Sequence, residues 1–189
     1  FNYSFARNKI LYQDEVNKKY AYQLGTGRRK DQFFGLIADG YYNSWEEVNA
    51  LDRPASAWSG DKLQPGDIKY VDVNHDGKID NYDQVYLGKG GWYGAPFTLG
   101  VNFTAKWRGF TFFALGVGNF GAHGVKNSSY YWVREAGKYS AVVRNRWTPA
   151  TAATATYPRL STLSGSNNFV TSDFWLYKTD AFRLAKVQI

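Results

Sequence analysis

The sequence contains neither cysteine nor methionine among its 189 residues. The absence of cysteine excludes disulfide bonds, thiolate metal sites and cysteine nucleophiles. No run of about 18 apolar residues occurs, which excludes a transmembrane helix. No initiator methionine or signal peptide is present, and both ends have the pattern of strands. We therefore expect the chain to be a fragment of a longer protein.

Motifs for catalysis and for nucleic-acid binding are also missing. The net charge is +7, but lysine and arginine are scattered, and no basic stripe is interleaved with aromatic residues. Nucleic acid is therefore not an expected partner. The two histidines, His75 and His123, lie in unrelated contexts, and no Ser-His-Asp set, nucleotide-binding loop or zinc motif is found. The sequence does not predict an enzyme.

Aromatic residues are abundant, at 19% of the chain, with 15 Tyr, 13 Phe and 7 Trp. Tyr, Phe, Trp, Val and Thr favour strands because their bulky side chains pack across a pleated sheet. The composition predicts an all-β fold.

The clearest strand pattern runs from Phe97 to Trp107. Successive side chains of a strand point to opposite faces of its sheet. One face would carry Phe97, Leu99, Val101, Phe103, Ala105 and Trp107, and the other Thr98, Gly100, Asn102, Thr104 and Lys106. This alternation fits a membrane barrel wall between lipid and a wet lumen. A soluble sandwich with one face on a core gives the same alternation.

Three further strands are predicted. Trp107-Arg108-Gly109 forms a tight turn into a strand over residues 110–118, whose two faces are too similar to orient. Residues 1–9 alternate in the same way. Residues 182–189 alternate only if one extra residue, a β-bulge, lies near Ala185 or Lys186.

Long polar segments, residues 10–96 and 119–180, separate these strands. Loops of this length are unusual in a compact domain. Outer-membrane barrels have short turns on one side and long extracellular loops on the other. The asymmetry predicts an antiparallel transmembrane β-barrel with both long segments outside the cell.

A calcium-binding motif lies in the first long segment, at residues 72–83, with the ligand spacing of an EF-hand loop. Calcium prefers hard oxygen ligands, and Gly77 at the sixth position permits the sharp turn. The predicted ligands are Asp72, Asn74, Asp76, the backbone carbonyl of Lys78, and Asp83, with Asp80 acting through water. Carboxylates this close repel one another without a cation.

The residues that flank this motif predict short β-segments rather than helices, at 66–71 and 84–88. We therefore expect an EF-hand-like loop outside an EF-hand. Its expected role is a structural clip, because a bound ion offsets the entropy of closing a long loop.

The order of several blocks resembles the C-terminal part of the SusC/RagA-type TonB-dependent transporters of Bacteroidetes. The blocks are FARNKI at 5–10, DGYY at 39–42, PGDIKYVDVNHDG at 65–77, PFTLGVNF at 96–103, RGF at 108–110, YPRL at 157–160, SDFWL at 172–176 and FRL at 182–184. The Gly-Asp-Ile-Lys-Tyr block with its Asp-rich loop is the most specific. The family usually has Gly where His75 stands.

The resemblance implies part of a 22-stranded, plugged barrel in the outer membrane. It also implies a SusD-like surface lipoprotein as a lid, the TonB complex as energy source, and an oligosaccharide or peptide as substrate. The plug, the segment that contacts TonB and the last strands are not in this sequence. The alternative interpretation is a soluble calcium-dependent carbohydrate-binding β-module, which requires a second sheet over the apolar face.

Overall fold

The fold is all-β, as the sequence predicts. The computed structural model describes residues 1–58, 63–91, 94–134, 140–161 and 167–189, and the four gaps fall within the two long segments. The strands are β1 (Asn2–Phe5), β2 (Gln32–Gly35), β3 (Ala38–Tyr41), β4 (Ala55–Ser56), β5 (Ile68–Tyr70), β6 (Lys78–Ile79), β7 (Val85–Lys89), β8 (Phe97–Trp107), β9 (Phe110–Phe120), β10 (His123–Val125), β11 (Leu176–Lys178) and β12 (Ala181–Gln188). The helical elements are α1 (Trp45–Val48) and the 3₁₀ helices η1 (Ala21–Gln23), η3 (Asn81–Asp83), η4 (Ala141–Asn145) and η5 (Asp173–Trp175).

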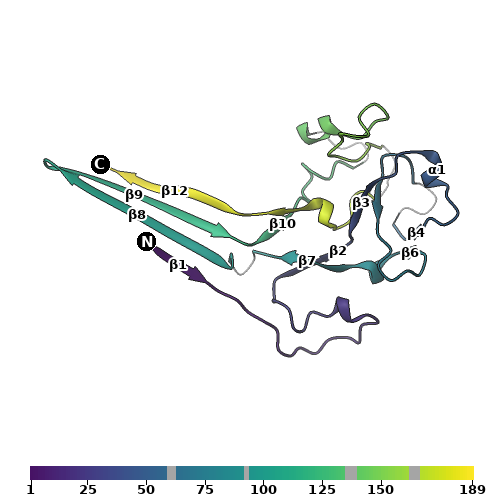
Figure 1. Ribbon diagram of the computed structural model, residues 1–189, viewed down its shortest axis with the longest axis horizontal. Coiled ribbons are helices and arrows are strands. Elements are labelled where there is room, and N and C mark those ends of the chain that lie inside the picture. Colours follow the sequence, from purple (N-terminus) through teal and green to yellow (C-terminus); the bar gives the residue numbers. More distant parts are fainter. Residues whose placement is uncertain (59–62, 92–93, 135–139, 162–166) are drawn as a thin grey trace.

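The long strands form one open antiparallel sheet in the order β1-β8-β9-β12 (Figure 1). A tight turn joins β8 to β9, in which Arg108 and Gly109 both have positive φ, at 46° and 88°. Two positive φ values give the turn the twist that a two-residue hairpin needs. The predicted hairpin is confirmed, and β9 extends two residues beyond the predicted end, to Phe120.

The cross-strand register settles the orientation of β9, which the sequence leaves open. Phe103 lies opposite Ala114 and Trp107 lies opposite Phe110, so the even-numbered residues of β9 share the apolar face of β8. This apolar face consists of Tyr3, Phe5, Phe97, Leu99, Val101, Phe103, Ala105, Trp107, Phe110, Phe112, Ala114, Gly116, Gly118, Phe120, Phe182, Leu184 and Val187. None of these residues is charged.

The opposite face carries all three charged residues of these strands, which are Lys106, Arg183 and Lys186. The predicted bulge is responsible for part of this segregation. The register of β12 against β9 shifts between Leu184 and Lys186. One extra residue reverses the facing of everything beyond it, so Val187 joins the apolar face.

The strands at the two ends are shorter or shifted relative to prediction. β1 ends at Phe5 rather than at Lys9, because its partner β8 begins at Phe97; one further backbone bond runs from Ala6 N to Pro96 O over 2.8 Å. β12 begins one residue early, at Ala181, and ends at Gln188.

The two long segments gather beyond one end of the sheet, opposite the β8–β9 turn (Figure 1). Among the described residues, four two-stranded sheets form there, β2-β7, β3-β5, β4-β6 and β10-β11, and of these four β4-β6 is parallel. Side chains from both segments share one core: Leu36, Ile68, Tyr70 and Ile79 from the first, with Val133, Val143, Tyr157 and Trp175 from the second. We call this packed part the loop body.

None of the helices within the described residues is long and apolar enough to cross a membrane.

Candidate metal centre

The predicted calcium loop occupies residues 72–83, between β5 and β7. Its middle is anchored by β6, which pairs in parallel with β4 so that Ala55 lies opposite Lys78. Ile79, the second residue of β6, is only 3% exposed and belongs to the core of the loop body. The loop is therefore held at its centre as well as at its ends.

A tight turn brings three of the predicted ligands together. His75 and Gly77 have positive φ, at 58° and 79°. The turned backbone directs amides at the side-chain oxygens: Asp76 N donates to Asn74 Oδ1 over 2.9 Å, and Gly77 N donates to Asp72 Oδ2 over 2.8 Å. Positive φ is unfavourable for a side chain at position 75, where glycine is free to adopt it.

Asp76 closes this turn. Its Oδ1 accepts from the amide of Lys78 over 3.0 Å, and its Oδ2 accepts from Asn74 Nδ2 over 3.1 Å. The carbonyls of Gly77 and Ile79 accept from the β4 side, from Ala55 N and Ala57 N. Because carbonyls alternate along a strand, the carbonyl of Lys78 faces away from β4.

Asp83, the predicted closing ligand, has a different environment. It is fully buried, and its carboxylate accepts from Val73 N and Asp80 N, both over 2.8 Å, and from Asn74 N over 3.4 Å. Burial raises the pKa of Asp83, while these backbone donors oppose the rise. In this structure the Asp83 carboxylate joins the two ends of the loop by accepting from their backbone amides.

The donor set fits a hard cation in part. Asp72, Asn74 and Asp76 supply oxygens on one turn, and a carboxylate oxygen that accepts one N–H keeps a lone pair for a metal. Within the described part of the chain, no three His, Asp or Glu side chains already form a metal-binding group. Calcium at this loop therefore stays a prediction, with Asp72, Asn74 and Asp76 as its best-placed ligands.

An unpredicted contact joins this loop to the segment around η1. The Tyr22 hydroxyl donates to the carbonyl of Tyr82 over 2.6 Å, and Gln23 Nε2 donates to the carbonyl of Asn81 over 2.8 Å. The Lys19 ammonium lies 5.2 Å from the centre of the Tyr82 ring. Its pKa is raised, mainly by a hydrogen bond with Tyr20 and further by the charge of Asp76. No local pattern in the sequence signals this contact, which spans about 60 residues.

A second unpredicted cluster surrounds Asp67, just before the loop. The Asp67 carboxylate lies 2.7 Å from Arg159 Nε and accepts from Asn168 Nδ2 over 2.8 Å. Asn168 Oδ1 in turn accepts from Ile68 N over 2.8 Å. The resemblance marked residues 65–77 and 157–160 as separate blocks, and the structure brings these blocks into contact.

No protein-family model matches the chain. A search of the curated proteins finds no match either.

Proposed function

We propose that the chain is part of an outer-membrane transporter of the SusC/RagA, TonB-dependent type, which imports oligosaccharides or peptides. In this proposal β1, β8, β9 and β12 are neighbouring strands of the barrel wall. Their apolar face meets lipid, and their charged face meets the wet lumen. The loop body lies on the extracellular side.

The segregation of charge across the four-stranded sheet carries the proposal. Ten of its exposed large apolar side chains lie on the uncharged face: Tyr3, Phe5, Val101, Phe103, Trp107, Phe110, Phe112, Phe182, Leu184 and Val187. Phe103 and Trp107 are 58% and 68% exposed. An apolar band outside and polar residues inside is the pattern of a membrane barrel strand.

The size of this surface requires an apolar partner. Fully burying one such side chain contributes about 1.5–3 kcal/mol. Ten partly exposed side chains therefore represent ~10 kcal/mol or more, which rivals the whole net stability of a typical domain. A monomeric soluble protein rarely leaves so much contiguous apolar surface in water.

Calcium has a structural role in this proposal. Asp72, Asn74 and Asp76 would bind the ion, with the Lys78 carbonyl and Asp83 completing the shell if Asp83 exchanges a backbone donor for the metal. The ion would offset repulsion among the carboxylates and hold the loop against the core through Ile79. The expected partners are a SusD-like lipoprotein over the loop body and the TonB complex, reached through a plug outside this sequence.

The competing interpretation, a soluble calcium-dependent carbohydrate module, requires a second layer of protein over the apolar face. Fractionation separates the two interpretations. We expect the protein to remain in the outer-membrane pellet after a high-salt wash and to need detergent for release. A monomer that stays in solution without detergent would overturn the transporter proposal.

Cysteine labelling tests the facing of the strands, because the sequence has no cysteine of its own. Phe103→Cys and Thr104→Cys place neighbouring thiols on opposite faces of β8. In membranes, we expect Cys at position 103 to react preferentially with a lipid-soluble maleimide and Cys at 104 with a water-soluble one. The same reagent preference at both positions would contradict the assignment.

A further inference from the structure

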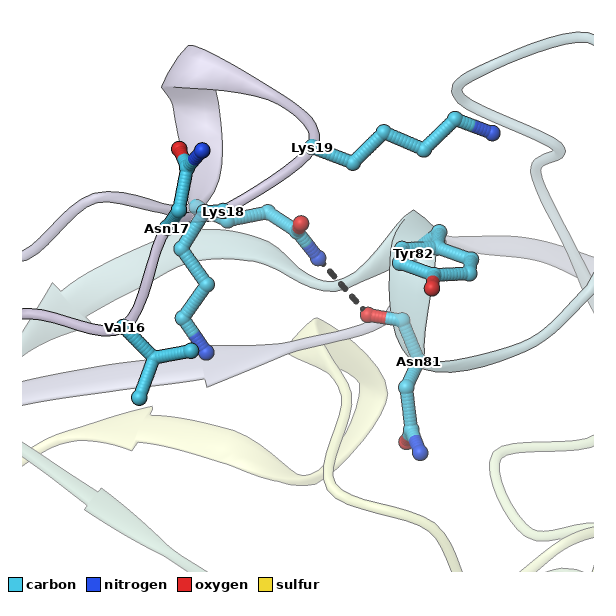
Figure 2. A pocket seen from close by; sticks show the side chains of 7 residues that line it. Val16, Asn17, Lys18, Lys19, Asn81 and Tyr82 are labelled. Carbon is cyan, nitrogen blue, oxygen red and sulfur yellow. Dashed lines mark hydrogen bonds between the residues drawn. The ribbon is translucent and has the colours of Figure 1, made fainter.

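A groove lies between the segment before β2 and the 3₁₀ helix of the metal loop. It consists of two adjoining hollows of about 370 and 500 Å³, and both are lined by Lys18, Gln23 and Asn81. Figure 2 shows the first hollow, with Lys18 on one wall and Asn81 on the other. We call the two hollows together the amide groove.

The metal loop supplies one wall of this groove. Asn81 and Tyr82 belong to η3. The Asn81 carbonyl accepts from Gln23 and the Tyr82 carbonyl accepts from Tyr22, and these two bonds join this wall to the opposite one. The dashed line in Figure 2 marks the bond to the Asn81 carbonyl. The ring of Tyr20 packs edge-on against that of Tyr82, with the ring centres 6.0 Å apart. The shape of the groove therefore depends on the shape of the metal loop.

Six of the thirteen residues that line the groove carry amide side chains. They are Gln13, Asn17, Gln23, Gln32, Asn81 and Gln84. An amide carries two donor hydrogens and an acceptor oxygen, which matches the hydroxyl groups of a sugar. Gln23 and Gln84 each already donate one N–H to Asn81, which leaves each of them a second N–H. Gln32 Oε1 is buried and has no donor among the described residues. Val16, Phe34 and the Tyr82 ring are the apolar side chains of the lining.

The charged side chains that line the groove give it a net positive charge, from Lys18 and Lys19 against Glu15. Lys18 lines both hollows, and no ion pair to it occurs among the described residues. Lys19 lies over the rings of Tyr20 and Tyr82, 5.0 and 5.2 Å from their centres. The one carboxylate in the lining, Glu15, already accepts from Gly25 N and Thr26 N over 2.9 and 2.6 Å. A ligand that brings a negative group would therefore find the Lys18 ammonium unpaired.

We infer that the amide groove binds an acidic oligosaccharide. The amides hydrogen-bond its hydroxyl groups, Lys18 pairs with its carboxylate or sulfate, and the exposed ring of Tyr82 stacks on a sugar face. This inference rests on the proposed function and narrows its substrate class. It also gives the metal loop a part in ligand binding, because this loop forms the wall that contains Asn81 and Tyr82.

Calorimetry on the purified protein, in detergent and with calcium, tests the inference. The probes are tetragalacturonate and a hyaluronan tetrasaccharide, compared with neutral maltotetraose and with the peptide tetraglutamate. We expect an acidic tetrasaccharide to bind more tightly than both comparison ligands. Tighter binding of tetraglutamate would assign the groove to acidic peptides and overturn the inference, and so would a failure of both acidic sugars to bind.

Matched lysine variants locate the site. Lys18→Gln removes the unpaired charge and is expected to weaken binding of the acidic sugar about tenfold, as for loss of one charge-assisted hydrogen bond. Lys178→Gln removes an exposed lysine on β11, outside the groove, and is expected to leave binding unchanged. Equal weakening by both substitutions would mean attraction by net charge alone and would overturn the site.

Membrane fractionation and sugar binding by the protein can fail independently of each other. A protein that fractionates with the outer membrane but binds no acidic sugar disproves the groove alone. A protein that binds the sugar through Lys18 but stays soluble disproves the transporter and supports the groove.

Discussion

The Asp67 carboxylate and the Arg159 guanidinium form a buried ion pair, with Oδ1 and Nε 2.7 Å apart, between residues that are 92 positions apart in sequence. Their side chains are 3% and 15% exposed. The pair joins the first long segment to the second, beside the β-segment that leads into the metal loop. Two segments that the sequence presents as separate loops are thereby fixed to each other.

Breaking this pair is expected to destabilise the loop body. Asp67→Ala leaves the Arg159 charge buried without its partner, which costs about 3–5 kcal/mol. Asp39→Ala breaks the exposed pair with Lys69, at 3.2 Å, and should cost less than about 1 kcal/mol. Thermal unfolding followed by tryptophan fluorescence measures both, because Trp147 and Trp175 are buried in this part. Equal shifts in the two variants would argue against the proposed importance of the buried pair.

Gly66 and Gly27 form a second matched pair. Both have positive φ, at 91° and 85°, but a Cβ at Gly66 would lie 2.4 Å from the Trp147 ring, whereas nothing lies within 4 Å at Gly27. Gly27→Ala should cost only the backbone strain, about 1–2 kcal/mol. Gly66→Ala adds about 1–3 kcal/mol for overpacking. Differential scanning calorimetry checks the order, and a Gly66 variant no less stable than the Gly27 variant would contradict it.

Removal of calcium is expected to loosen residues 66–87. Without the ion, repulsion among Asp72, Asp76 and their neighbours is uncompensated, so a chelator should speed proteolysis and amide exchange there. Residues 20–23 should lose protection as well, because Tyr22 and Gln23 bond to η3. Asp76→Asn should reproduce the effect of the chelator, while His75→Gly, which keeps every predicted ligand, should not. Unchanged protection with and without chelator would refute the metal clip.

Glu15 supplies a pH-dependent contact at the amide groove. Its carboxylate accepts from the Thr26 hydroxyl and from the amides of Gly25 and Thr26, and these bonds lower the pKa of Glu15 from 4.5 to about 2. A lowered pKa means that the anion stabilises the folded contact. The contribution is complete above pH ~4.5 and is lost as pH falls through about 2.

Amide exchange at Gly25 and Thr26 checks this pH dependence. We expect their protection, relative to neighbouring amides, to fall as the pH drops from 4.5 towards 2. Glu15→Gln keeps the shape of the side chain but removes its charge. In this variant the amides of Gly25 and Thr26 should be less protected at pH 7 than in the wild type, and their protection should not change with pH. A wild-type protein whose relative protection stays constant across this range would contradict the assignment.

The spacing of residues in the metal loop was enough to predict part of the candidate site. Twelve consecutive residues define which oxygens can share a turn, and the structure does bring Asp72, Asn74 and Asp76 together. The environment of Asp83 could not be predicted in the same way. Its carboxylate accepts from the amides of Val73, Asn74 and Asp80, an arrangement that the spacing of the ligands does not specify.

The sequence by itself determined the all-β class, the β8–β9 hairpin and the bulge in β12, because each follows from the alternation of neighbouring side chains with period two. Only the tertiary structure decided the facing of β9, the contact of Tyr22 with the metal loop and the pairing of Asp67 with Arg159. β9 is nearly as apolar on one side as on the other, so its register against β8 sets its orientation. The other contacts join residues about 60 and 92 positions apart, and no local pattern records which distant surfaces pack together.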